Sequence, residues 1–135
     1  MRHWILKTEP SSYSIADLKR DGKTIWDGVR NYQARNNLKS MKVGDLAMIY
    51  HSVGPREIVG IARVTKGAFD EATNDKGDWV AVEVEFSEEL KQTISLQTLK
   101  QDASLQDLSL IKQSRLSVCP VTKEQWLKIL RHAQA

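Results

Sequence analysis

The chain has 135 residues, of which 41% are hydrophobic and 27% charged, and its formal net charge is +3. This length and composition are typical of one soluble globular domain, so we expect a single domain over residues 1–135. The single cysteine, Cys119, excludes a disulfide within the chain, and no apolar run approaches the ~20 residues that span a bilayer.

The first third of the chain reads as a strand followed by two helices. The strand covers about His3–Lys7 and is broken by Pro10, which restricts its own backbone and that of the preceding residue. Ser14, with Asp17 three residues later, is a capping box for a helix that ends at Asp21-Gly22. Apolar residues at helical spacing predict a second helix over about Tyr32–Met41.

Three strands are predicted next, at about Leu46–His51, Glu57–Lys66 and Trp79–Phe86. In the third strand, valines alternate with smaller or charged residues, a period of two that gives one buried and one wetter face. Residues 67–78 are rich in Gly, Asn and Asp and are expected to form a polar loop.

Short helices are expected after Ser87, with Ser95 and Ser104 as N-caps and a last helix beginning at Thr122. Mostly antiparallel strands with helices segregated around them give an α+β class. A strongly curved sheet of this size can close into a barrel, although the sequence pattern does not establish closure.

Lys7 and Glu9 lie two residues apart at a strand end, so we expect their side chains on the same side. A carboxylate can accept hydrogen bonds from the exocyclic amine of a base, and an ammonium can donate to phosphate. An exposed ion pair without function would fit the same pattern.

Two tryptophans are candidate walls of a binding site. Trp26 lies in a segment without helical or strand periodicity, followed by Gly28, and Trp79 heads a strand on the face opposite its valines. A base can stack between two such rings. Trp26 as a core residue is an equally good interpretation.

Arg30 and Arg35 lie in a polar run, and their planar guanidinium groups suit phosphate. Basic residues also predominate at both ends of the chain: the net charge is +5 over residues 1–42, −6 over 43–90 and +4 over 91–135. The two basic parts would form a phosphate-attracting surface if they share a face. A mixed solvated surface is the alternative.

Enzyme signatures are largely missing from the sequence. It has no glycine-rich phosphate loop and no nucleophile elbow, and its three histidines and one cysteine lack metal-ligand spacing. We therefore expect no cofactor, no metal and no membrane partner. The N-terminus lacks a signal-peptide pattern, which favours a cytoplasmic protein, and a monomer is the favoured state.

Together these segments resemble the EVE family over almost the whole chain. The resemblance is carried by HWILKTEPSSYS at 3–14, WDGVRNYQARNNLKSMKVGD at 26–45, YHS at 50–52, IVGIARV at 58–64, DW at 78–79 and QSRLSVCPVTKEQW at 113–126. It implies a PUA-like β-barrel related to the YTH and ASCH domains, and a reader of modified bases in DNA or RNA. It also implies a pocket lined or bordered by Lys7, Glu9, Trp26, Asn31, Tyr50, His51, Ser52 and Trp79, with Arg30 and Arg35 on flanking phosphates.

The acidic residues Glu9 and Asp27 stand where methyladenine readers have small polar residues. Because a carboxylate prefers a donor edge, the amine of cytosine suits them better than N6-methyladenine. Two other functions stay open: an ASCH-like amidohydrolase using Lys7 and Glu9, and an interaction scaffold in which both tryptophans are structural.

Overall fold

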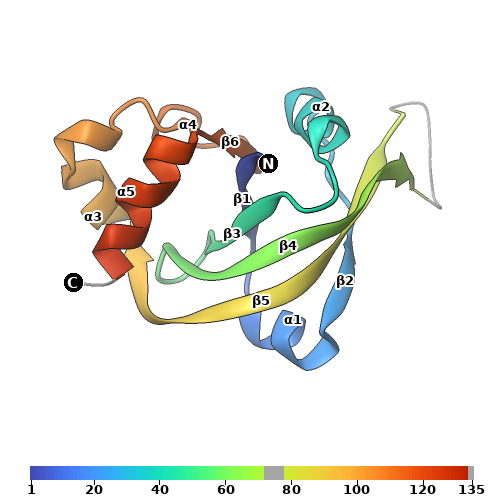
Figure 1. The fold of residues 1–135 in the computed structure, drawn as a ribbon, viewed down its shortest axis with the longest axis horizontal. Coiled ribbons are helices and arrows are strands. Elements are labelled where there is room, and N and C mark those ends of the chain that lie inside the picture. The colour runs from blue at the N-terminus through green and yellow to red at the C-terminus, as the bar shows by residue number, and fades with distance from the viewer. Residues whose placement is uncertain (72–77, 134–135) are drawn as a thin grey trace.

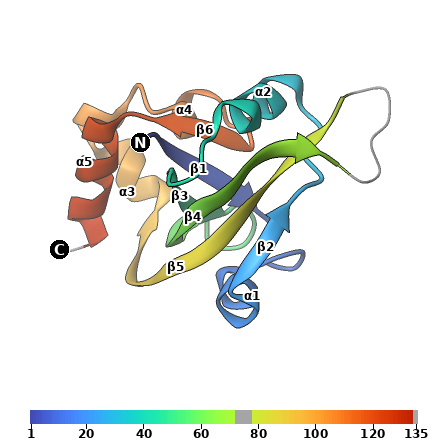
Figure 2. The same ribbon diagram turned by 45° about the vertical axis from the view of Figure 1, so that its right-hand side comes forward.

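The computed structural model describes residues 1–71 and 78–133. One six-stranded sheet forms the centre of the molecule, with helices around it (Figures 1 and 2). The strands are β1 (His3–Thr8), β2 (Lys23–Trp26), β3 (Leu46–His51), β4 (Glu57–Asp70), β5 (Val80–Ser95) and β6 (Val118–Val121). The helices are α1 (Ile15–Asp21), α2 (Tyr32–Ser40), α3 (Leu96–Gln101), α4 (Ser109–Lys112) and α5 (Lys123–Ala133), with a 3-10 turn at Ala103–Leu105.

The strand order is β2-β5-β4-β3-β1-β6. β1 runs parallel to β3, and the other neighbours are antiparallel, so the predicted α+β class with mixed strands is confirmed. β4 and β5 are long and strongly bent, with several register shifts between them. Within the described residues the end strands β2 and β6 do not pair, so the sheet is curved but is not a closed barrel.

Local capping signals set several helix boundaries. The Ser14 side chain accepts from the Asp17 N–H, and the Asp17 carboxylate accepts from the Ser14 N–H, as the capping box predicts. The same exchange between Thr122 and Gln125 begins α5. Ser95 caps α3, whereas Ser104 lies inside the 3-10 turn, whose cap is Asp102.

Four features of the sheet differ from the sequence prediction. β4 continues to Asp70, although residues 67–78 were predicted to form a polar loop, and residues 72–77 of that segment lie outside the described residues. β2 and β6 were not expected, because both are four-residue strands whose hydrogen-bond partners lie far away in sequence. β5 continues to Ser95, although residues beyond Ser87 were predicted to be helical. This part of β5 is mostly exposed and polar, so it lacks the alternation that marks a half-buried strand.

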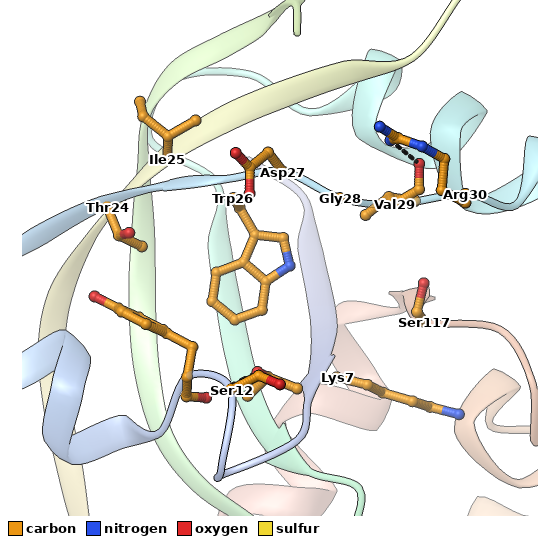
Figure 3. A pocket seen from close by; sticks show the side chains of 12 residues that line it. Lys7, Ser12, Thr24, Ile25, Trp26, Asp27, Gly28, Val29, Arg30 and Ser117 are labelled. Atoms are coloured by element: carbon orange, nitrogen blue, oxygen red, sulfur yellow. Dashed lines mark hydrogen bonds between the residues drawn. The ribbon is translucent and has the colours of Figure 1, made fainter. Parts of the chain in front are cut away.

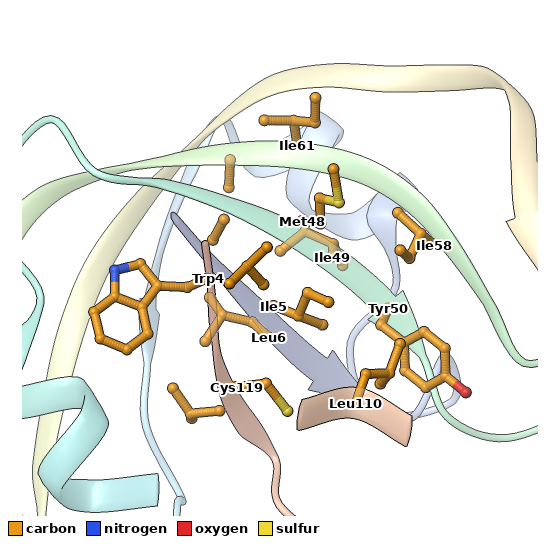
Figure 4. Close-up of a cluster of buried hydrophobic side chains, with 14 of the residues drawn as sticks. Trp4, Ile5, Leu6, Met48, Ile49, Tyr50, Ile58, Ile61, Leu110 and Cys119 are labelled. Carbon is orange, nitrogen blue, oxygen red and sulfur yellow. The ribbon is translucent and has the colours of Figure 1, made fainter. Parts of the chain in front are cut away.

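The core is formed by the sheet and the helices that pack against it, and Figure 4 shows part of it at β1, β3 and β6. Ile5, Leu6 and Met48 are fully buried there. The buried carboxylate of Asp45 accepts from the Trp4 indole at 3.1 Å and from backbone N–H groups, which anchors β1 beside β3. None of the described helices is long and apolar enough to cross a membrane.

Candidate functional site

A hollow of about 450 Å³ opens at one end of the sheet (Figure 3). It lies between the end of β1, the turn before α1, and the end of β2 with the loop that follows. Its volume is within the ~300–1,000 Å³ typical of ligand pockets. It is lined by Lys7, Thr8, Ser12, Tyr13, Thr24, Ile25, Trp26, Asp27, Gly28, Val29, Arg30 and Ser117.

Trp26 forms a wall of this hollow. It is the last residue of β2 and is 8% exposed. The ring of Tyr13 meets it edge-on, with centroids 6.3 Å apart and planes at 88°. The Tyr13 hydroxyl donates to Asp21 at 2.8 Å, and its backbone carbonyl accepts from the Thr8 hydroxyl at 2.8 Å, so the aromatic pair is held from both sides.

The loop after Trp26 is held by Glu71, whose side chain is 6% exposed. Its carboxylate accepts two hydrogen bonds from the Arg30 guanidinium, at 2.8 and 2.9 Å, and a third from the Gly28 N–H at 3.2 Å. Gly28 has φ of 79°, a conformation that glycine adopts without steric cost. Glu71 therefore fixes the rim of the hollow from the end of β4.

Lys7 borders the hollow, but its ammonium group points away from Trp26 (Figure 3). The Nζ atom donates to the Ser114 carbonyl at 2.9 Å, and partial burial lowers the pKa of the amine. Glu9 is exposed and is not among the residues that line the hollow. The expected Lys7–Glu9 pair is absent from the ion pairs of the described residues, and Asp27 supplies the acidic group of the hollow instead.

Tyr50, His51 and Ser52 do not line the hollow but support the elements around it. Tyr50 is 3% exposed and belongs to the core. His51 Nε2 accepts from the Ile15 N–H at 3.2 Å, and burial lowers the pKa of the imidazole, which favours this neutral acceptor. Ser52 donates its N–H to the Thr8 carbonyl at 3.0 Å, joining the ends of β1 and β3.

Trp79 does not face Trp26 across the hollow. Its ring stacks on Tyr32 at 5.1 Å and lies 5.2 Å from the Arg30 guanidinium, while Arg35 lies 5.0 Å from the Tyr32 ring. The expected slot between two tryptophans is therefore not formed by the described residues. Trp79 was predicted to head the strand Trp79–Phe86, whereas β5 begins at Val80, and the strand period could not identify the neighbours of the Trp79 ring.

Asn31 caps α2, because its side chain accepts from the Ala34 N–H at 2.9 Å. This role explains the residue type at the start of the helix. The Arg35 guanidinium donates hydrogen bonds to the side-chain oxygen of Asn36. The sequence prediction of a phosphate contact for Arg35 and Arg30 stays a prediction.

The hollow combines one aromatic wall with several hydroxyl groups and one carboxylate, a set able to stack a planar ring and bond its polar edge. Several lining residues were not predicted as site residues, although Thr8 and Val29 lie in segments that stood out in the sequence: Thr8, Ser12, Tyr13, Thr24, Ile25, Val29 and Ser117. They are scattered over four segments with no shared spacing. Tyr13 stood out only as a residue at the start of a predicted helix. Ser117 reaches the hollow because it directly precedes β6.

Solved structures give two informative similarities. The chain superposes on a crystal structure of human THYN1 protein in complex with 5-methylcytosine-containing DNA with a TM-score of 0.92 and 31% identity, covering 100% of this chain and 99% of that one. It superposes on the YTH domain of Zygosaccharomyces rouxii MRB1, in complex with N6-methyladenosine RNA, with a TM-score of 0.61. The identity there is 16% over 98% of this chain and 86% of the YTH chain, so this match shows a shared fold alone.

Sequence comparison agrees with the expected resemblance. Human thymocyte nuclear protein 1 is 35% identical over 92% of this chain and 70% of its own length. The EVE domain model matches residues 2–132. The chain therefore belongs to the EVE domain family.

Proposed function

We propose that this protein is a nucleic-acid-binding module that takes one modified base, cytosine by preference, into the hollow beside Trp26. The observation that carries the proposal is the similarity over the whole chain to human THYN1, which has been crystallised with 5-methylcytosine-containing DNA. The hollow supplies a matching chemistry of aromatic wall and polar edge.

In this proposal the target nucleotide leaves its stack, at a cost of a few kcal/mol, and its base lies against the indole of Trp26. Asp27 is the acceptor for the N4 amine of cytosine, because it lines the hollow and Glu9 does not. The Thr8, Ser12 and Ser117 side chains offer further polar contacts. Tyr50, His51, Ser52 and Asn31 act through the elements that they hold, and Lys7 borders the base through its aliphatic stem.

The affinity of oligonucleotides tests this function. Burying one methyl group contributes about 0.8 kcal/mol, so 5-methylcytosine should bind about fourfold more tightly than cytosine in the same sequence. Fluorescence anisotropy with labelled DNA and RNA strands, single and double, measures the ratio in each context. Equal affinity for methylated and unmethylated strands in every context would contradict the proposal.

A pair of variants locates the effect. Asp27→Asn keeps the size of an exposed side chain but replaces an acceptor-only group by one that also donates. It should weaken binding of the cytosine oligonucleotides. Asp107→Asn makes the same change at an exposed site outside the hollow and should leave binding unchanged. Equal effects of the two variants would exclude Asp27 as a base contact.

A further inference from the structure

A second hollow lies directly beside the first. It measures about 320 Å³ and is lined by Asn31 and Gln33 on one side and by residues 112–116 on the other. Adjacent stretches of the chain line the two hollows. Residues 28–30 and Ser117 line the first, and Asn31 and residues 112–116 line the second. Lys7 connects them, since its stem lines the first and its ammonium bonds the Ser114 carbonyl at the edge of the second.

The fold holds these walls together. The Asn37 side chain donates to the Val118 carbonyl at 2.7 Å, which fixes α2 against β6. The segment that leads into α2 therefore lies beside the segment that leads into β6. Residues far apart in sequence meet at this point in a fixed arrangement, so the second hollow, called the groove below, lies next to the Trp26 hollow.

The groove is basic and polar. Lys112 and Arg115 line it with exposed side chains, and neither appears among the ion pairs of the described residues. Gln33 and Gln113 add amide donors, and none of the described residues that line the groove is acidic. Arg30, by contrast, is engaged by the carboxylate of Glu71.

We propose that this groove binds the phosphodiester backbone next to the base in the Trp26 hollow, with Lys112 and Arg115 as the charged contacts. This inference rests on the proposed function for the position of the base. An ammonium and a guanidinium are suited to phosphate oxygens, and such contacts position a strand without reading its sequence. The groove adds two phosphate contacts to those predicted for Arg30 and Arg35.

The test is a double variant, Lys112→Gln with Arg115→Gln, measured against Lys91→Gln with Arg131→Gln. The control removes the same charge from exposed positions on β5 and α5. Each phosphate contact on a single strand contributes about 0.7 to the slope of log affinity against log salt. Between about 50 and 200 mM salt, the wild type should therefore lose about sevenfold more affinity than the groove variant. The control variant should keep the slope of the wild type.

Three ligands separate the possible results: a 5-methylcytosine oligonucleotide, its unmethylated counterpart and the 5-methyldeoxycytidine nucleoside. We expect the groove variant to weaken both oligonucleotides equally and to leave nucleoside binding unchanged. A groove variant with the slope of the control overturns the groove and leaves the base pocket intact. A wild type that binds both oligonucleotides alike, with a reduced slope in the groove variant, overturns the base selectivity and keeps the groove. Inorganic phosphate at millimolar concentration that competes as well as the oligonucleotide would show a free-anion site and overturn the backbone assignment.

Discussion

Glu71 is the buried side chain that holds the rim of the Trp26 hollow, and its substitution gives the sharpest stability prediction. From the residues that the structure describes, the carboxylate accepts two hydrogen bonds from Arg30 and one from the Gly28 N–H. Glu71→Gln preserves size but leaves one acceptor oxygen, and its new NH₂ group must face one of the same donors.

The magnitude follows from what the substitution breaks. Hydrogen bonds to charged groups contribute about 1.5–3 kcal/mol each, and at least one is lost here. The Arg30 side chain is 41% exposed, so water compensates part of the loss. We therefore expect Glu71→Gln to reduce the free energy of unfolding by about 1.5–3 kcal/mol.

Equilibrium denaturation in guanidinium chloride, followed by far-ultraviolet circular dichroism, measures this change. Glu85→Gln is the matched control, because Glu85 bonds Arg63 at 2.8 Å on an exposed part of the sheet, where a pair contributes about 0–1 kcal/mol. If Glu71→Gln is no more destabilising than Glu85→Gln, the assignment of Glu71 as the anchor of the loop is wrong.

Three further predictions concern protonation, reactivity and packing. The pKa of His51 is lowered below its ordinary 6.5 because burial outweighs the opposing charge of Glu57, so the unfolded chain takes up its proton first as the pH falls. The free energy of unfolding should then decrease as the pH falls below about 6.5, and His51→Gln should make this decrease smaller, whereas an unchanged pH dependence would exclude the role. Burial raises the pKa of Cys119 to about 11, so a thiol reagent at pH 8 should label it only after denaturation, and rapid labelling of the native protein would contradict its buried position. A Cβ at Gly60 would lie 2.7 Å from the Glu88 carbonyl, so Gly60→Ala should cost about 1–3 kcal/mol in the same denaturation assay, and a neutral result would show that β4 shifts freely at its bulge.

Local signals in the sequence predicted the parts of the fold that depend on neighbouring residues. The capping boxes at Ser14 and Thr122 work within four residues, and each begins its helix as expected. β2 and β6 depend on pairing with distant strands, so their four-residue segments carry no periodic signal of their own. The family resemblance implied a β-barrel, of which the mixed α+β sheet is confirmed and the closure is not.

In the candidate site, too, features set by neighbouring residues were predicted and features set by distant residues were missed. Trp26 was predicted to be a pocket wall or a core residue, and it has both positions, because it lines the hollow and belongs to the hydrophobic core. The prediction that Lys7 and Glu9 point to the same side was wrong because β1 ends at Thr8. Beyond that residue, strand alternation no longer determines which face of the sheet a side chain occupies. Glu71 was missed because its partner, Arg30, lies 41 residues away in sequence. No short-range pattern encodes such a contact.

The position of the bound base tests the central claim most directly. A crystal structure of this protein with an oligonucleotide that contains 5-methylcytosine should show the methylated base out of its stack, with its ring against Trp26 and its amine directed to Asp27. A base that remains stacked in the strand, with the Trp26 hollow filled only by solvent, would contradict the account.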